Sequence, residues 1–507
     1  MARVHFVSLG CPKNRVDAEH MLGLSLAAGH ELVQSPDEAD AIVVNTCAFI
    51  GEAKVESVNT ILEMAERKAA GGQKLIVSGC LAQRYIGELE RELPEVDHFL
   101  GTSDYREIAR VLGGAQPESA DPGASAPEAG SGFIPLSSLT RPKANGAGEG
   151  ERNLVTADLD FVAGCDLPRK NSMPRYTAYL KIAEGCDNTC AFCIIPTLRG
   201  KQRSRPIDDL VAEAKRLAAE GVVELNLIAQ DLTGYGHDLE GKPKLHELLA
   251  ALSEVEGIRW VRCMYAYPRT LTAELLTLLD EGKNTLPYLD IPVQHGSDRV
   301  LRRMRRGRDQ KRLGELLVGV RERVRNAVLR STVIVGFPGE DDDDFQKLVD
   351  FVEQVRFERL GVFKYSDEEG TAAFDLDEKL PAKVKRSRYD KLMRRQRRIH
   401  AAHLEGLVGQ VHEAIVEGQS DEHELLVVGR LWSQAPEIDG ITYLSSPRSL
   451  RVGEIVHVRI TDAHDYDVVA EVLDEDDAEI ALSKPFRCRE QRVAREAGRA
   501  SLERVDA

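Results

Sequence analysis

Three thiols stand in one short stretch, Gly185-Cys186-Asp187-Asn188-Thr189-Cys190-Ala191-Phe192-Cys193. The stretch follows an apolar segment, Ala178–Ile182, whose composition predicts a β-strand. Three thiolates in this CxxxCxxC spacing can bind three irons of a four-iron cluster, and the fourth iron then stays open to a small molecule. A zinc site normally has a fourth protein ligand, but the next cysteine is Cys263 and the nearest following histidine is His237. We therefore favour an iron–sulfur cluster over zinc or inert buried thiols.

The stretch opens an α/β region that we assign to residues 175–403. Each expected strand precedes a helical or loop segment, which predicts an incomplete (βα)6 barrel with its active site at the carboxyl ends of the strands. A basic stretch, Lys383–His400, is expected to be helical. The six expected strands are Ala178–Ile182, Glu224–Ala229, Val261–Tyr267, Tyr288–Val293, Leu329–Val335 and Leu360–Lys364.

Several polar residues and glycines fall at these strand ends. Gln230 and Asp231 end the second strand, Gln294 and His295 end the fourth, and Val335-Gly336-Phe337-Pro338-Gly339-Glu340 ends the fifth. Glycines let a backbone approach a ligand closely. Each residue also has an ordinary interpretation, such as a turn glycine or a satisfied loop histidine. The candidates for cofactor contact are Gln230, Gly336, Pro338 and Gly339, and those for substrate contact are Gln294 and His295.

A second set of cysteines occupies equivalent positions in an N-terminal α/β region, residues 1–113. Cys11, Cys47 and Cys80 each follow one of the first three expected strands directly. Carboxyl ends of parallel strands line one edge of a sheet, so we expect these thiols to converge and to hold a second cluster with one open iron. The alternative is three unrelated buried thiols. The expected strands are Val4–Leu9, Ala41–Asn45, Leu75–Ser78 and Val96–Leu100, separated by helices Val16–Ala28, Ala53–Ala69 and Leu81–Leu93.

Three further segments complete the domain organisation. Residues 114–174 are rich in Gly, Ala, Pro, Ser and acids, which predicts a long flexible linker. Residues 404–475 contain four short strand patterns and predict a small all-β, OB-like barrel, and residues 476–507 form a C-terminal tail. The predicted fold class is α/β with this appended barrel. Its expected strands are Val411–Glu417, Leu425–Leu431, Ile455–Ile460 and Val468–Leu473.

Length and composition limit the possible classes of protein. The 507 residues exceed the roughly 250 to 300 at which a single core stops growing, so several domains are expected. Neither a secretion signal nor an apolar window of membrane-spanning length is visible, which predicts a cytoplasmic protein without a membrane partner. Nine cysteines, an odd number, argue against a disulfide framework. No role is evident for Cys165, Cys263 or Cys488.

With these residues in view, the chain resembles the radical S-adenosylmethionine (SAM) methylthiotransferase family as far as about residue 475. That family joins a three-cysteine domain, a radical SAM core and a TRAM barrel in this order, and Phe192 occupies the aromatic position before the last core cysteine. The resemblance therefore makes Phe192 a further candidate for cofactor contact. Two departures are the long linker and the acidic run Asp341–Asp344. The resemblance implies SAM and two 4Fe–4S clusters, one held by Cys11, Cys47 and Cys80 and one by Cys186, Cys190 and Cys193.

Two segments resemble the branch of this family that modifies a ribosomal protein: Leu9-Gly10-Cys11-Pro12-Lys13-Asn14 and Gln434-Ala435-Pro436-Glu437-Ile438-Asp439-Gly440. That branch implies transfer of a methylthio group to the β-carbon of an aspartate in the twelfth protein of the small ribosomal subunit, either free or assembled. One SAM would methylate a sulfur, and a second, cleaved with an external reductant, would yield the radical that removes hydrogen from this carbon. The alternatives are a tRNA adenosine methylthiotransferase and a non-enzymatic iron–sulfur electron carrier.

Charge favours a protein substrate. The formal net charge is −16, and residues 404–475 contain four arginines and no lysine among many acids. A barrel that binds RNA should be basic, whereas an acidic one suits a cationic protein, so we expect no dedicated tRNA binding. Arg302–Arg308 and Arg394–Arg398 are arginine-rich runs that could touch ribosomal RNA near the target or be solvated helix faces. The candidate barrel contacts are Glu422, Glu424, Asp465 and Asp467, although acids can also serve only to solvate a small barrel.

Overall fold

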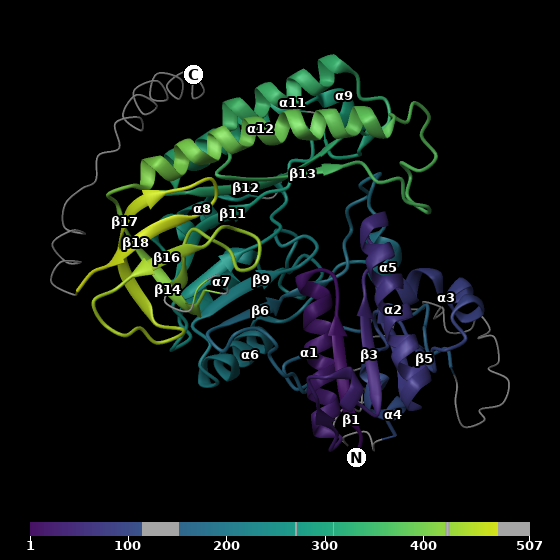
Figure 1. Cartoon of the computed structure of the whole chain (residues 1–507). Helices are drawn as coiled ribbons and strands as arrows, with labels where there is room; N and C mark the ends of the chain where they lie inside the picture. The colour runs from purple at the N-terminus through teal and green to yellow at the C-terminus, as the bar shows by residue number, and fades with distance from the viewer. Residues whose placement is uncertain (114–151, 269–270, 308, 421–422, 424–425, 475–507) are drawn as a thin grey trace. The chain divides into compact units, whose positions relative to one another are not determined.

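The computed structural model describes residues 1–113, 152–268, 271–307, 309–420, 423 and 426–474. The chain divides into two compact units. The first contains Met1–Ser172 together with Ile195–Gly200, and the second contains Met173–Ile194 and the chain from Lys201 onward. Each unit has its own parallel sheet (Figure 1).

The first unit is built on a five-stranded sheet in the order β2-β1-β3-β4-β5, all of whose neighbours pair in parallel. Every residue of the central strand β3 is buried, which explains its continuous apolar sequence. The chain order reverses between β1 and β3, and ligands gather outside the carboxyl ends of strands at such a point. The strands are β1 Arg3–Ser8, β2 Glu31–Leu32, β3 Ala41–Thr46, β4 Lys74–Gly79 and β5 His98–Leu100.

Three α-helices connect strands of this sheet, and a fourth, α4, follows the last strand. The expected helices are present, and the third begins at Cys80 itself, one residue earlier than predicted. The two-residue strand β2 was not predicted, because it is too short to show an alternating pattern. The helices are α1 Pro12–Ala27, α2 Gly51–Gly71, α3 Cys80–Glu92 and α4 Ile108–Val111, and the first unit also holds α5 Ile195–Arg199.

Residues 152–172 belong to the first unit rather than to a flexible linker. The backbone of Phe99 pairs with Arg152 and Leu154, and the buried carboxylate of Glu19 forms a 2.6 Å ion pair with Arg169. The polar composition concealed this packing, because a few apolar side chains are enough to attach the segment. These are Leu154, Phe161 and Leu167, which pack against the core of the first unit. Residues 114–151 of the expected linker lie outside the described residues.

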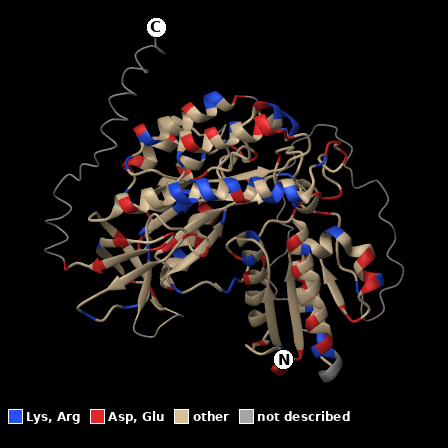
Figure 2. Ribbon diagram, turned by 45° about the horizontal axis from the view of Figure 1, so that its top comes forward, with Lys and Arg blue, Asp and Glu red and all other residues tan. Residues whose placement is uncertain are grey.

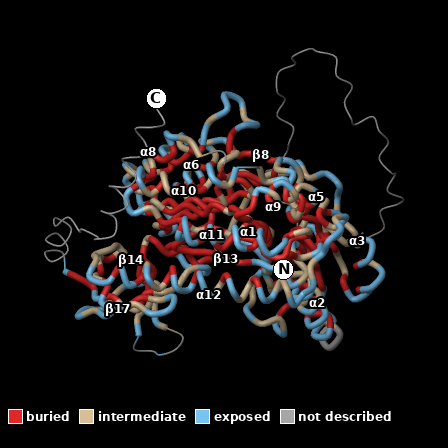
Figure 3. Tube along the Cα trace, turned by 90° about the horizontal axis from the view of Figure 1, so that it is seen from above, coloured by how far each residue is buried: buried red, intermediate tan, exposed pale blue. Residues whose placement is uncertain are grey.

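The second unit contains a six-stranded parallel sheet in the order β13-β12-β11-β10-β9-β6. All six predicted strands are present, and the order confirms a partial barrel rather than a closed one. Buried residues concentrate in the strands, while exposed residues lie on the helices and loops (Figure 3). The strands are β6 Thr177–Lys181, β9 Glu224–Ile228, β10 Trp260–Cys263, β11 Thr285–Asp290, β12 Val328–Val335 and β13 Arg359–Lys364.

Helices follow the strands of this sheet as βα units require. A small ribbon, β7 Ala183–Glu184 with β8 Arg203–Ser204, flanks the CxxxCxxC stretch. The basic stretch is helical as predicted and continues to Leu407. The helices are α6 Ile207–Ala219, α7 Leu245–Ser253, α8 Ala273–Glu281, α9 Asp298–Arg303, α10 Gln310–Arg323, α11 Asp342–Val355 and α12 Ala382–Leu407.

A closed five-stranded barrel, in the order β14-β15-β16-β18-β17, belongs to the same compact unit as the six-stranded sheet. A buried ion cluster joins the two, because Glu224 of β9 pairs with Arg430 of the barrel at 2.6 Å and with Arg262 of β10 at 3.0 Å. The predicted barrel is confirmed, with one strand, β16, that the sequence did not reveal. The strands are β14 Val411–Gln419, β15 Val427–Leu431, β16 Thr442–Ser445, β17 Ile455–Ala463 and β18 Val468–Val472.

Candidate functional site

The three core cysteines lie on the loop that follows β7 in the second unit. Cys186 is buried, whereas Cys190 and Cys193 are half-buried. Asn188 Nδ2 lies 3.4 Å from Cys186 Sγ, and Arg306 Nη1 lies 3.5 Å from Cys190 Sγ. Burial raises the pKa of the Cys186 thiol, while the Asn188 hydrogen bonds lower it. Hydrogen-bond donors aimed at cysteine sulfurs are the groups that stabilise thiolates bound to iron.

The three thiols at this loop are the kind of ligand that iron–sulfur clusters use in proteins. Among the described residues, no group of three His, Cys, Asp or Glu side chains forms a site for a single metal ion. Three thiols on one loop, with nitrogen donors directed at two of the sulfurs, fit an iron–sulfur cluster.

The end of β9 contacts the cysteine loop through two hydrogen bonds. Asn188 Nδ2 donates to Asp231 Oδ2 at 2.7 Å, and Gln230 Nε2 donates to Glu184 Oε1 at 2.6 Å. Glu184 also forms a buried 2.8 Å ion pair with Lys181. The predicted strand-end residues Gln230 and Asp231 are thus tied to the residues that precede and form the loop.

The turn after β12 packs beside the same loop. Phe192 contacts the apolar cluster that includes Phe337 and Tyr365, so the aromatic residue of the loop and the glycine-rich turn share one cluster. Gly336 and Gly339 have φ values of +75° and +79°, a region that only glycine adopts without strain. The turn residues Gly336, Pro338 and Gly339 are therefore brought next to the cysteine loop in the second unit.

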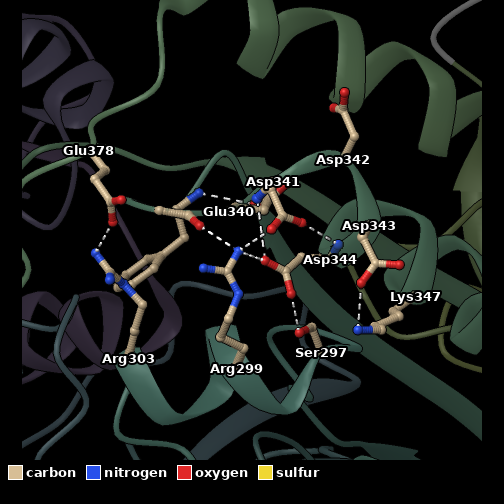
Figure 4. Close-up of polar contacts among 12 residues, drawn as sticks. Ser297, Arg299, Arg303, Glu340, Asp341, Asp342, Asp343, Asp344, Lys347 and Glu378 are labelled. Atoms are coloured by element: carbon tan, nitrogen blue, oxygen red, sulfur yellow. Dashed lines mark hydrogen bonds and ion pairs between the residues drawn. The ribbon is translucent and has the colours of Figure 1, made fainter.

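Glu340 closes this turn from inside. Its buried carboxylate accepts hydrogen bonds from the backbone N–H groups of Gly336 at 2.6 Å and Phe337 at 3.1 Å, and it pairs with Arg388 at 2.8 Å. Figure 4 shows how Glu340 and the acidic residues after it are arranged. The shape of the turn is held by charge-assisted hydrogen bonds rather than by the glycines alone.

The acidic run Asp341–Asp344 caps helix α11. Asp341 accepts a hydrogen bond from the Asp344 N–H at 2.8 Å and completes a capping box with it. Asp343 pairs with Lys347 at 2.7 Å, and Asp344 binds Ser297 and Arg299 (Figure 4). Carboxylates at a helix N-terminus are stabilised by the unpaired N–H groups and by the helix dipole. This departure from the family pattern therefore leaves the neighbouring turn intact.

Gln294 and His295 follow β11 as predicted, but their environments differ. His295 is fully buried, its Nδ1 accepts from the Ser297 N–H at 3.0 Å, and its Nε2 lies 3.6 Å from Glu340. Nδ1 therefore has a partner, whereas the buried Nε2 has no hydrogen-bond partner among the described residues. The ordinary interpretation of a satisfied loop histidine thus accounts for only one of the two ring nitrogens. Gln294 is half-buried with φ of +69°, and its backbone bonds to β12. A substrate contact by either residue stays a prediction.

The three N-terminal cysteines lie at the carboxyl edge of the first sheet. Cys11 precedes α1 after β1, Cys47 follows β3, and Cys80 begins α3 after β4. A Cβ atom on Gly10 would lie 2.8 Å from Cys47 Cβ, so the loop of Cys11 packs directly on Cys47. Cys11 and Cys47 are also near enough to Cys80 to raise the pKa of its thiol by charge repulsion. The structure thus brings together three thiols that are far apart in the sequence, beside the point where the strand order reverses.

A buried arginine that the sequence analysis missed completes this group. Arg199 Nη2 lies 3.6 Å from Cys80 Sγ, and its Nη1 donates to Asp17 Oδ2 at 2.8 Å. Burial raises the pKa of the Cys80 thiol to about 12, and Arg199 acts against this shift. Burial likewise raises the pKa of Cys47. The only signal in the sequence is the position of Arg199 six residues after Cys193, which does not identify its partner.

The predicted acidic contacts of the barrel have mixed environments. Glu422 and Glu424 lie outside the described residues. Asp465 is exposed, whereas Asp467 accepts a 2.8 Å hydrogen bond from the Ile441 N–H and shapes a turn. Other barrel acids are used internally, as Glu417 pairs with Arg430 and Asp439 binds Tyr288. The acidic surface of the barrel is therefore smaller than its composition suggests.

Comparisons with family models and solved structures define the class. Residues 3–101 match the uncharacterized protein family UPF0004, residues 180–352 the radical SAM superfamily, and residues 408–473 the TRAM domain. The solved structure of the radical SAM methyltransferase TsrM from Kitasatospora setae covers 73% of this chain and 73% of its own, with a TM-score of 0.51 and 14% identity, which shows the fold alone. The protein is a radical SAM enzyme with a C-terminal TRAM domain, and this class uses an iron–sulfur cluster and SAM.

Curated relatives define the family. The ribosomal protein uS12 methylthiotransferase RimO of Anaeromyxobacter sp. (strain K) is 51% identical over 95% of this chain and 96% of its own length. The RimO of Myxococcus xanthus is 52% identical over 94% of this chain and 92% of its own. The chain belongs to the radical SAM methylthiotransferases, in the RimO family. Among the described residues, no helix has the length and apolar character needed to cross a membrane.

Proposed function

We propose that this enzyme transfers a methylthio group to the β-carbon of an aspartate in ribosomal protein uS12, with two 4Fe–4S clusters and two molecules of SAM. One observation supports the proposal: the chain has two separate sets of three thiols, one at the carboxyl ends of the parallel strands β1, β3 and β4 and one on the single loop after β7. The names of the RimO relatives support the choice of substrate.

The chemistry needs groups that the side chains cannot supply. When bound, the core cluster supplies the electron that cleaves SAM to methionine and a 5′-deoxyadenosyl radical, and the N-terminal cluster supplies the place where a second SAM methylates sulfur. The 5′-deoxyadenosyl radical takes the β-hydrogen of the aspartate and becomes 5′-deoxyadenosine, and the β-carbon gains a C–S bond. The transferred sulfur starts at the oxidation level of sulfide. Formation of the C–S bond therefore releases one electron, which replaces the electron spent on the cleavage of SAM. An external reductant starts the cycle.

The chain's own residues hold and orient these groups. Cys186, Cys190 and Cys193 would each bind one iron, with Asn188 and Arg306 donating to two of the sulfurs. The turn Gly336–Gly339 offers close backbone approach to SAM, and Glu340 fixes its shape. In the first unit, Cys11, Cys47 and Cys80 would bind the second cluster beside Arg199.

A ribosomal substrate, free or assembled, would place the enzyme in the cytoplasm. Of the alternatives, a tRNA enzyme is less supported because exposed acids such as Asp465 remain on the barrel. An electron carrier is less supported because it needs no iron left open by a missing fourth thiolate.

The test compares two triple variants of anaerobically reconstituted enzyme. Cys186→Ala/Cys190→Ala/Cys193→Ala should abolish 5′-deoxyadenosine formation. Cys11→Ala/Cys47→Ala/Cys80→Ala should lose about half of the iron, keep measurable 5′-deoxyadenosine formation and lose methylthio transfer. Mass spectrometry of uS12 and of tRNA after incubation identifies the product. Full iron and full transfer in the N-terminal variant, or a methylthio group on tRNA alone, would refute the proposal.

A further inference from the structure

Helix α12 carries a concentration of positive charge on an acidic chain. Residues Ala382–Leu407 include nine Lys or Arg residues and only two acids, Asp390 and Glu405, whereas the whole chain has a net charge of −16. Figure 2 shows the row of cations along this helix. The charge of α12 is therefore opposite to that of the protein as a whole.

The cations of α12 occupy the face opposite to its buried residues. The buried side chains Leu392, Gln396 and Ile399 recur at intervals of three and four, which defines the inner face of an α-helix with about 3.6 residues per turn. Seven cations are exposed and spread over the outer face. They are Lys383, Arg386, Lys391, Arg394, Arg395, Arg397 and Arg398.

The cations on the inner face of α12 form contacts within the protein, but most of those on the outer face do not form ion pairs with described residues. Arg388 is buried and pairs with Glu340, and Lys385 donates to the Tyr365 carbonyl at 2.9 Å. On the outer face, Arg386 pairs with Asp390 and Arg395 with Glu353. No carboxylate of the described part of the chain lies within ion-pair distance of the remaining arginines, Arg394, Arg397 and Arg398. These three arginines are available to an external anion.

We propose that the outer face of α12 binds the phosphate backbone of ribosomal RNA and positions the enzyme on the assembled small subunit. Lys383 to Arg398 spans about 22 Å along the helix, enough for several consecutive phosphates. Guanidinium groups bind phosphate oxygens in pairs, and arginine predominates on this face. A cationic ribosomal protein would be repelled here. The choice of ribosomal RNA, rather than another RNA, rests on the proposed function.

The test variant is Arg394→Gln/Arg397→Gln/Arg398→Gln, which removes three exposed charges and keeps good helix formers. The control is Lys311→Gln/Arg312→Gln/Arg323→Gln, which removes the same charge from exposed positions of α10. Both are made in the full-length, reconstituted enzyme. The first probe is purified small-subunit ribosomal RNA without protein, titrated over a range of salt concentrations in the absence of SAM.

The α12 variant should bind this RNA at least about tenfold more weakly than the control variant, and the slope of log affinity against log salt should fall by about 2. Modification of assembled subunits should fall in parallel, while modification of free uS12 should match the control. Equal RNA affinity and equal slope in the two variants would overturn the proposal. The proposal would also be overturned if the α12 variant bound tRNA more weakly than the control variant but modified assembled subunits equally well. If the wild-type enzyme modifies no uS12, but the α12 variant still binds the RNA more weakly than the control variant, the proposed function fails and the RNA-binding role of α12 stands.

Discussion

Arg199 Nη2 lies 3.6 Å from Cys80 Sγ, and both residues are buried in the first unit. Asp17 holds the other terminal nitrogen of the guanidinium at 2.8 Å, and Asn14 Oδ1 lies 3.3 Å from Nη2. A buried cation beside three thiols stabilises their anionic, iron-bound form, because burial alone disfavours negative charge. The first unit therefore contains a fixed positive group where the second cluster would bind.

Arg199→Met should weaken retention of iron by the N-terminal cysteines. A hydrogen bond to a charged group contributes about 1.5 to 3 kcal/mol, so iron loss to a chelator should be about ten- to a hundredfold easier. The reduction potential of this cluster should become more negative, because both charge and a hydrogen bond to sulfur are lost. Iron analysis and redox titration followed by electron paramagnetic resonance measure both effects.

Arg199→Lys should show a smaller shift of the reduction potential than Arg199→Met. Arg110→Met, at an exposed position of α4, should change neither the reduction potential nor the retention of iron. Formation of 5′-deoxyadenosine should persist in all three variants, because it depends on the core cysteines. An unchanged potential in Arg199→Met would contradict the electrostatic role, whatever its effect on folding.

Gly336→Ala should impair the turn beside the core cysteines. The residue has φ of +75°, and an added Cβ would lie 2.5 Å from Lys385 Cγ. Left-handed backbone costs an ordinary residue about 1 to 2 kcal/mol, which predicts about five- to thirtyfold weaker SAM binding if the turn gives way. Equilibrium binding of SAM measures this. Gly406→Ala, in α12 with open space around it, should bind SAM normally; equal affinity in both variants would remove the turn from the cofactor site.

Glu224→Gln should destabilise the contact between the barrel and the six-stranded sheet. Glu224 is fully buried between Arg430 and Arg262, so its neutralisation leaves the buried Arg262 guanidinium without its counter-charge and leaves Arg430 with Glu417 alone. Loss of one partner of a buried ion pair costs about 3 to 5 kcal/mol. Urea unfolding measures the change. Glu315→Gln, at an exposed position of α10, should alter the free energy of unfolding by less than about 0.5 kcal/mol.

Glu224 should also make the free energy of unfolding depend on pH. Burial alone would raise the pKa of Glu224, but Arg430 and Arg262 lower it to about 2 from an ordinary value of 4.5. Because the pKa is depressed in the folded state, the stabilisation is complete above about pH 4.5 and is lost as the pH falls toward 2. Unfolding curves between these values should converge for wild type and Glu224→Gln; a constant difference would contradict this assignment.

Charge reversal on the barrel should separate the two possible substrates. Asp462→Lys/Asp465→Lys changes two exposed acids, and it should weaken capture of a cationic protein without altering SAM cleavage. Added salt should weaken the wild-type complex. A tRNA enzyme predicts the opposite sign, because positive charge attracts phosphates. Binding assays with uS12 and tRNA distinguish them, and improved tRNA binding with wild-type uS12 modification would show that the barrel does not select the protein.

Much of the fold could be predicted because strands and helices leave local periodic patterns. All ten expected strands of the two parallel sheets are present, and the three N-terminal cysteines meet because each follows a strand of one sheet. The short strands β2 and β16 escaped prediction, since two to four residues show no clear alternation. Residues 152–172 were assigned to a linker, because their few apolar anchors are outnumbered by polar residues.

The two cysteine sets, the order of the domains and the basic helix can be predicted from the amino-acid sequence, because thiol spacing, strand periodicity and charge are local properties of the chain. Which charged groups meet depends on how the chain packs in three dimensions. Arg199 reaches Cys80, Glu224 is buried between two arginines, and Glu340 closes the turn at Gly336. These partners are either distant in the sequence or separated by no characteristic spacing, so the sequence does not identify them. Packing excludes water around each buried charge, and a buried charge without a partner would be costly.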